Sequence, residues 1–580
     1  MRKFFAVIFS GLVLAAAPPA LAQSAGLPPA IASAGVTQPQ WNAIRANVRA
    51  EARRANVAEA ALLAAAEAAG ARFAGTGRFS ALSLQQAVSA QLAEQADQIG
   101  ELQRRLGELA GDADPTIGPL FVQARTALNE GRLADADDLL SQVAESDLAA
   151  IQQADAEAAR RRLRAGETII SRGNVAYLQA NYPLAAQHAA RAADIAPQSA
   201  RDIRWTYRTL QADALKEQGL RFDGAASLLR SVRVSQDLVL PLAQRDAFPQ
   251  QWARTQNAIG VAYTMLADLG VDGAFAQAVA AYQAALEVRT QASDPEAWAE
   301  TNVNLANALI GAGARSSPAM LDRAVAGFEA ALQVFTPTDA PRRWATAQNN
   351  LGLALYELGE RGRSGALEQA VRAFQAALRV RTLASDPAGW ASTQNNLGLA
   401  YAALADQQAP AMLPLAIEAY ENALSVRSRA NAPTDWADTK INLSNAYSEL
   451  GEAGAAGMQE AAVAGYLDAA QVYTRDAAPR RWALIQMNLG TSYSLLAERG
   501  DPRMLDLAVQ AYESSHSVRT RSDDAFGWAL TSYNLAFAYR DQGRISDART
   551  AAQGALDVYR RLGDARRAQQ TEAFLNNLNR

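Results

Sequence analysis

Apolar and small residues recur at helical spacing through the second half of the chain. In the stretch that begins at Trp390, Leu397 and Tyr401 fall on one face of a predicted helix. Ala416 and Tyr420 repeat that spacing in a second predicted helix after a connection. The pattern predicts pairs of amphipathic helices that bury their apolar faces against each other and against neighbouring pairs.

Tryptophan shows that this pair of helices is repeated along the chain. Seven tryptophans follow one another at steps of 46 residues: Trp252, Trp298, Trp344, Trp390, Trp436, Trp482 and Trp528. A fixed period of tens of residues is typical of stacked supersecondary units, each of which contacts mainly its neighbours. We therefore predict an extended solenoid, which is a binding scaffold.

The composition agrees with an all-α protein. Hydrophobic residues make up 49% of the 580 residues and aromatic residues only 7%. Much of the apolar content is alanine, which has the highest helix propensity. The formal net charge is -4, so there is no pervasive basic field to attract phosphate groups, and we expect no nucleic-acid partner.

Candidate catalytic residues are scarce. Cysteine is absent, and for the two histidines, His188 and His516, a packing or surface role is a sufficient explanation. The sequence contains no glycine-rich phosphate loop and no carboxylates spaced as an acid–base pair. We expect no catalytic site, no metal and no cofactor.

The first residues form a predicted export signal. Arg2 and Lys3 precede an apolar run over residues 4–17, and Ala-Leu-Ala follows at 20–22. This order is typical of a secretory signal peptide, residues 1–22. The alternative is an uncleaved anchor, but the run is shorter than the ~20 residues that a bilayer requires. We expect a periplasmic or secreted protein without a transmembrane segment, with residues 23–40 as a flexible leader.

Residues 41–112 are predicted to be helical and carry a heptad-like apolar stripe between residues 80 and 110. Its members alternate steps of four and three: Val88, Leu92, Gln95, Ile99, Leu102, Leu106 and Leu109. Such a stripe predicts either a short coiled coil that joins two chains in a homo-oligomer or an amphipathic helix packed on the solenoid. Gly100 and Gly107 weaken a long coil and favour the amphipathic helix.

The repeated motifs resemble those of the tetratricopeptide repeat (TPR) family. Leu-Gly-x-x-Tyr at 397–401 and Ala-x-x-x-Tyr-x-x-Ala-Leu at 416–424 are signature types of that family, and they recur one unit earlier and one unit later. The resemblance is strong over residues 248–560 and loose over 119–197. It implies an all-α, right-handed α-solenoid, or superhelix, whose first helices line a concave groove.

The units differ from the family in length. A usual unit has about 34 residues, whereas 46 residues separate Trp390 from Trp436; the additional residues fall in the connections between helices. We predict irregular TPR-like repeats over residues 113–250. A regular solenoid of seven units, the last of ordinary length, is predicted over 251–562, and a C-terminal cap helix or tail over 563–580.

Asparagine stands six residues after every tryptophan but the first: Asn304, Asn350, Asn396, Asn442, Asn488 and Asn534. Three further asparagines, Asn349, Asn395 and Asn445, stand five or nine residues after a tryptophan. A carboxamide offers both a donor and an acceptor, so it can bind the backbone of an extended peptide. The resemblance implies the same use. The alternative is that these residues bond only the neighbouring helix and keep the repeats in register.

Two other repeated residue types have structural explanations. We expect each tryptophan in the first turn of a first helix, packed on the preceding unit, with a binding role as the alternative. Arginines recur near the end of second helices, at Arg289, Arg381, Arg427 and Arg519. Their charge suits the helix C-terminus, and ligand binding is again the alternative.

The sequence thus predicts an exported, non-enzymatic TPR-type scaffold. Its predicted partner is a protein or an extended peptide bound in the concave groove. The alternatives are a structural protein of the cell envelope that assembles into an oligomer, and an accessory subunit of an envelope enzyme complex.

Overall fold

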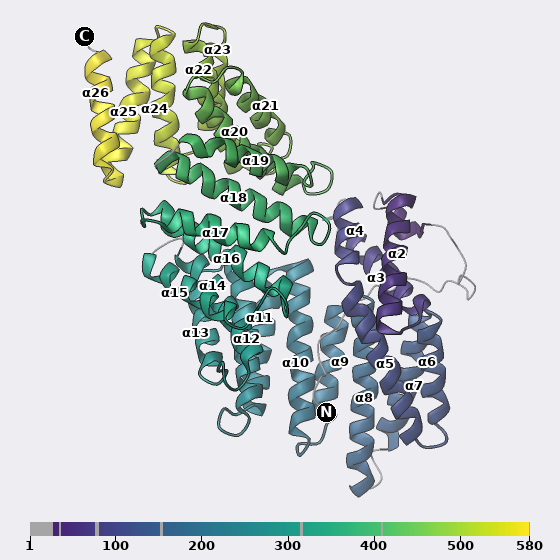
Figure 1. Cartoon of the computed structure of the whole chain (residues 1–580). Coiled ribbons are helices and arrows are strands. Elements are labelled where there is room, and N and C mark those ends of the chain that lie inside the picture. The colour runs from purple at the N-terminus through teal and green to yellow at the C-terminus, as the bar shows by residue number, and fades with distance from the viewer. Residues whose placement is uncertain are drawn as a thin grey trace. The chain divides into compact units, whose positions relative to one another are not determined.

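The computed structural model describes residues 27–33, 36–75, 81–150, 155–313, 317–407 and 410–578. Throughout these ranges the regular structure is helical, and successive helices pack in pairs (Figure 1). The predicted all-α solenoid is confirmed. The chain divides into two compact units, residues 1–334 and 335–580, and this division falls within the regular repeats. The predicted signal peptide, residues 1–22, lies outside the described residues.

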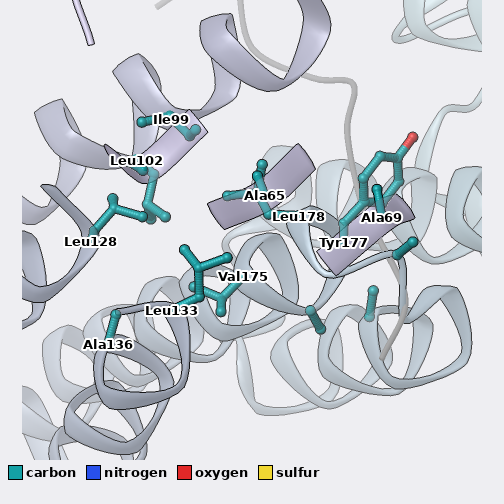
Figure 2. Packing of buried hydrophobic residues seen from close by; sticks show 14 of the residues in the cluster. Ala65, Ala69, Ile99, Leu102, Leu128, Leu133, Ala136, Val175, Tyr177 and Leu178 are labelled. Carbon is teal, nitrogen blue, oxygen red and sulfur yellow. The ribbon is translucent and has the colours of Figure 1, made fainter. Parts of the chain in front are cut away.

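The first unit opens with five helices that share a core with the helices that follow. They are α1 (Pro29–Ala32), α2 (Gln38–Ala55), α3 (Glu59–Gly75), α4 (Ala81–Ser89) and α5 (Leu92–Asp112). Figure 2 shows part of this core, with Ile99 and Leu102 of α5 near Leu128. Alanines such as Ala65 and Ala69 lie in the same cluster, where their small side chains let helices approach closely.

The prediction of a flexible leader over residues 23–40 is wrong in its described part. Residues 29–32 form α1, and α2 already begins at Gln38. Ile31 and Val36 are both buried in the core. The composition of this segment, rich in alanine, proline, glycine and serine, led to the prediction of a flexible leader. Burial of each of these two apolar side chains stabilises the fold by about 1.5–3 kcal/mol.

The heptad-like stripe is buried within the chain. Its first residues, from Val88 to Gln95, cross the break between α4 and α5. Val88, Leu92, Ile99, Leu102 and Leu106 are all at most 1% exposed. A coiled coil between two chains would need these side chains for the partner, so the structure favours the amphipathic helix packed on its own solenoid.

The first unit continues with irregular pairs and then two regular ones. Its further helices are α6 (Gly118–Asn129), α7 (Leu133–Ala150), α8 (Asp155–Leu178), α9 (Tyr182–Ile195), α10 (Arg201–Gln218), α11 (Ala225–Val234), α12 (Pro249–Asp268), α13 (Ala274–Leu286), α14 (Pro295–Gly313) and α15 (Pro318–Leu332). Two π-helical turns, Gly219–Asp223 and Ser235–Val239, flank α11. A 3-10 turn, Leu240–Leu242, follows the second of them.

The second unit contains the most regular part of the solenoid. Its helices are α16 (Pro341–Glu360), α17 (Ala366–Leu378), α18 (Pro387–Gln407), α19 (Leu413–Leu424), α20 (Pro433–Glu452), α21 (Met458–Ala470), α22 (Pro479–Glu498), α23 (Met504–His516), α24 (Ala525–Asp541), α25 (Ile545–Leu562) and α26 (Ala565–Leu578). In Figure 1 they follow one another in pairs, and α26 stands beside α25. None of the described helices is long and apolar enough to cross a membrane.

Several pairs are held together by close contact between a glycine on the first helix and an aromatic ring on the second. A Cβ atom added at Gly398 would lie 2.5 Å from Cε1 of Tyr420, and the same distance separates the equivalent atoms of Gly352 and Phe374. The start of the first helix is also as predicted. α18 begins at Pro387, and Asp386 Oδ1 accepts a hydrogen bond from the Gly389 backbone N–H.

This contact generates a first prediction. Gly398→Ala should destabilise the protein by about 1–3 kcal/mol, because the added methyl group overlaps a fully buried ring and forces the two helices apart. Urea unfolding followed by circular dichroism measures the loss. Gly111→Ala is the matched control, since nothing lies within 4 Å of its added Cβ. An equal loss in both variants would show that the close contact is not the cause.

Candidate functional site

The predicted asparagine column lies on the first helices of the repeats, and all six of its side chains are half-buried. Asn304, Asn396, Asn442 and Asn488 each donate a hydrogen bond from Nδ2 to an asparagine Oδ1 on the preceding first helix. These bonds are Asn304 to Asn257 (3.3 Å), Asn396 to Asn349 (3.2 Å), Asn442 to Asn395 (3.2 Å) and Asn488 to Asn445 (3.1 Å). The additional candidates Asn349, Asn395 and Asn445 are therefore the acceptors of this asparagine ladder.

Whether a ladder bond forms depends on which residue of the preceding first helix is in place to accept it. The usual acceptor stands five residues after the preceding tryptophan. Ile441 fills that position before Asn488, and the bond goes to Asn445, one turn farther along α20. Met487 fills it before Asn534, whose carboxamide forms no hydrogen bond within the described ranges.

The ladder agrees with the register-keeping interpretation, and peptide binding by the same residues stays a prediction. The Oδ1 atoms of Asn396, Asn442 and Asn488 have no hydrogen-bond donor among the described residues. Each of these oxygens can still accept a backbone N–H from a bound segment. Asn350 differs, because its Oδ1 accepts from Nδ2 of Asn349 at 3.0 Å.

A column of carboxylates, which the sequence reasoning missed, stands sixteen residues after the tryptophans. In the second unit its members are Glu360, Asp406, Glu452 and Glu498, all exposed. Each lies in the last turn of α16, α18, α20 or α22. A helix C-terminus carries partial negative charge and favours cations, so an acid repeated at four successive helix ends is electrostatically unfavourable. We name these four residues and Glu449 the acidic ends.

The acidic ends interact with one another. The pKa of Glu360 is raised, first by lost hydration among the surrounding helices and then by repulsion from Asp406. Lost hydration also raises the pKa of Glu449, with Asp406 and Glu452 adding to it. The pKa of Glu452 is raised by the same loss of hydration, which Arg499 partly offsets. Glu360, Asp406, Glu449 and Glu452 therefore form one coupled negative region.

The asparagine ladder and the acidic ends share a helix face. On α20, Asn442, Asn445, Glu449 and Glu452 stand at steps of three, four and three residues, which is the spacing of one helical stripe. The face thus offers carboxamides midway along the helix and negative charge at its end. Reading the columns at the 46-residue period across all positions, rather than only near the tryptophan, would have found the acids.

The tryptophans are half-buried and lie in the first turn of their helices, as expected. The repeated arginines are not explained by the C-terminus of their own helix. Arg427 lies beyond the end of α19 and donates to Thr439 Oγ1 of α20 (2.9 Å) and to Ser392 Oγ of α18 (2.8 Å). Arg381 makes equivalent bonds to Thr393 and Thr346. These arginines join one pair of helices to the next.

A groove of about 1580 Å³ lies in the first unit, between α5 and the N-terminal turns of α10 and α12. Glu167 of α8 lies in it, accepting from Arg105 and from the buried hydroxyl of Tyr207, each at 2.7 Å. Trp205 also lines it, and its Nε1 donates to Thr255 (3.3 Å). Trp205 precedes Trp252 by 47 residues, so it extends the tryptophan series by one imperfect step that the sequence reasoning missed.

No family model matches the sequence, and no curated protein does. Solved structures do match. The C-terminal part of a TPR repeat-containing protein from Cytophaga hutchinsonii has 13% identity and a TM-score of 0.34, over 55% of this chain and 97% of that one. The apo form of RapI has 14% identity and a TM-score of 0.42, over 70% and 99%. A Rap protein complexed with competence and sporulation factor has 12% identity and a TM-score of 0.39, over 76% of this chain and 98% of that one.

The class of protein follows from the helix pairs themselves. Glycine–aromatic contacts at TPR signature positions and successive packing of the pairs define an all-α solenoid of the tetratricopeptide type. The solved structures to which the chain is similar include the C-terminal part of a TPR repeat-containing protein. Their identities and TM-scores are too low for their ligands to be assigned to this chain.

The asparagine ladder generates a second prediction. Asn442→Ala should lower the free energy of unfolding by about 1 kcal/mol more than Asn534→Ala, because only Asn442 gives up a hydrogen bond between helices. Both changes gain the same helix propensity, so their difference isolates the bond. Urea midpoints of the two variants measure it. If the midpoints coincide, the ladder does not hold the register.

Proposed function

We propose that the chain is an exported, non-enzymatic interaction scaffold whose second unit binds an extended, basic protein segment. The segment lies across the first helices α16, α18, α20 and α22. The observation that carries this proposal is the helix face with carboxamides midway and carboxylates at its end, present in successive repeats.

The two parts of the face have different roles in recognition. The free Oδ1 atoms of the ladder accept backbone N–H groups, which gives affinity without regard to sequence. The acidic ends select lysine or arginine side chains and raise the rate of encounter. A cationic partner also relieves the mutual repulsion among Glu360, Asp406 and Glu449, so part of its binding energy comes from strain already present in the free protein.

A second candidate function is a structural one, in which the repeats serve only to build a rigid envelope element. The asparagine ladder supports it, since those bonds have a sufficient role in register. The two candidates differ in one measurement. Binding of a basic peptide that is unchanged by Asn396→Ala and Asn442→Ala together favours the structural role for these residues.

The acidic ends generate a third prediction. A fluorescent peptide of alternating lysine and serine should bind the Glu449→Gln/Glu452→Gln variant about tenfold more weakly than the wild type, a change of ~1.4 kcal/mol. Fluorescence anisotropy at low and at physiological ionic strength measures it, and salt should weaken wild-type binding most. The matched control is Glu418→Gln/Glu460→Gln, two exposed acids on the second helices α19 and α21. Equal affinity in both double variants contradicts the proposal.

The same peptide should bind more weakly as the pH falls. Because the pKa values of Glu449 and Glu452 are raised above 4.5, these side chains lose charge at a higher pH than an ordinary glutamate does. Stability changes in the opposite direction. A raised folded-state pKa means that the charged form costs stability, so the free protein gains stability as the pH falls through that pKa and loses it again as the pH rises.

Export is a separate part of the proposal and generates a fourth prediction. The chain recovered from its own cells should be found outside the cytoplasm and begin at Gln23, because the signal peptide ends at Ala22. Cell fractionation followed by mass spectrometry of the N-terminal peptide tests both points. An intact cytoplasmic chain that retains residues 1–22 contradicts export.

A further inference from the structure

Two positions vary together where a second helix is followed by the next first helix. The first position stands 37 residues after one tryptophan, and the second stands three residues after the next tryptophan. We call each such pair of residues a joint. The six joints are Arg289/Thr301, Phe335/Ala347, Arg381/Thr393, Arg427/Thr439, Tyr473/Ile485 and Arg519/Thr531. In the sequence, arginine is always paired with threonine, and an aromatic residue with an aliphatic one. At the last joint the Arg519 guanidinium donates to Sδ of Met487 (3.6 Å) rather than to Thr531.

The arginine joints are built from directed polar contacts. Nη1 of Arg289, Arg381 and Arg427 donates to the threonine hydroxyl of its joint at 2.8, 3.0 and 2.9 Å. Those threonines, Thr301, Thr393 and Thr439, are fully buried. The guanidinium therefore makes its bond inside the stack, where it is shielded from water.

An aspartate stands close to the arginine in the joints at Arg381, Arg427 and Arg519. Arg381 lies 3.5 Å from Asp386, and Arg519 lies 3.3 Å from Asp524. Both aspartates also accept a backbone N–H at the start of the next first helix. One carboxylate thus caps the helix and balances the charge of the joint.

The aromatic joints reverse this arrangement. Tyr473 packs in an apolar cluster with Ile485 and Leu489 of α22. Here the cation belongs to the next first helix: the Arg481 guanidinium of α22 lies 5.8 Å from the ring of Tyr473. Position 478, where the arginine joints at Arg381 and Arg519 have an aspartate, is alanine. The same exchange of residue types occurs at Phe335, where Arg343 lies 5.7 Å from the ring.

We infer that the joints determine which repeat units can be neighbours, because the arginine–threonine joint and the aromatic–aliphatic joint are chemically incompatible. A unit that ends in arginine requires threonine in the unit that follows, and one that ends in an aromatic residue requires an aliphatic partner. This pairing rule specifies unit order and register in a chain whose units otherwise share the same period.

The physical reason is the cost of a mismatch. An arginine facing Ile485 would be a buried cation without an acceptor, which is among the most costly defects in a protein interior. A tyrosine facing Thr439 would leave the buried hydroxyl without the guanidinium that donates to it. Apolar contact alone does not discriminate between neighbours in this way, because it is not directional.

The test converts one joint into the other kind within the full-length chain. Tyr473→Arg alone should lower the Tm strongly. Adding Ile485→Thr should recover part of the loss, and adding Ala478→Asp as well should recover most of it. Circular dichroism melting measures the Tm of each variant. A Tyr473→Arg chain that is not rescued by its added partners overturns the proposal.

A second, milder test addresses the arginine joint without the risk of unfolding. Thr439→Val keeps the shape but removes the acceptor, whereas Thr439→Ser keeps the hydroxyl. Hydrogen exchange at the start of α20 should become about tenfold faster in the valine variant, as expected when a bond to a charged group is lost. It should stay near the wild-type rate in the serine variant. Equal exchange in both variants also overturns the proposal, and neither test depends on peptide binding.

Discussion

The structure depends on the register between successive pairs of helices. A single pair cannot bury both of its faces, so its stability comes from the pairs on either side. The apolar part of that contact is rich in alanine, which fits many relative positions. Polar contacts therefore set the register at three levels along the first helix: Arg427 with Thr439 near its start, Asn442 with Asn395 midway, and Tyr447 with Glu421 farther on.

The sequence predicts the fold because the fold is local. Most helix pairs combine a small residue on the first helix, an aromatic ring on the second and a starting proline within one period, and the periodic tryptophans give that period directly. The sequence does not predict that a compact unit ends at residue 334, because this division depends on contacts between many units. The burial of Ile31 is missed for the same reason, since the surface that covers it comes from distant segments.

The site is predicted less completely, and the asparagines show why. Their column is visible in the sequence, but the stagger between adjacent helices is not. That stagger brings position six of one unit against position five of the preceding unit, so Asn396 meets Asn349. The acidic ends are equally visible, yet a single exposed glutamate at a helix end has an ordinary explanation. Only their coupling across α16, α18 and α20 distinguishes them.

One face of the first helices must therefore both hold the register between repeats and leave side chains available for a ligand. A side chain that holds the register is less available to a ligand. Asn349, for example, is buried and its Oδ1 accepts the bond from Asn396. What remains for recognition must lie beside the ladder, as the acidic ends do. Those acids oppose the helix dipole and repel one another, so they cost stability that the glycine–aromatic contacts and the joints must offset. Residues that weaken a fold in the same place in successive repeats point to a use outside folding.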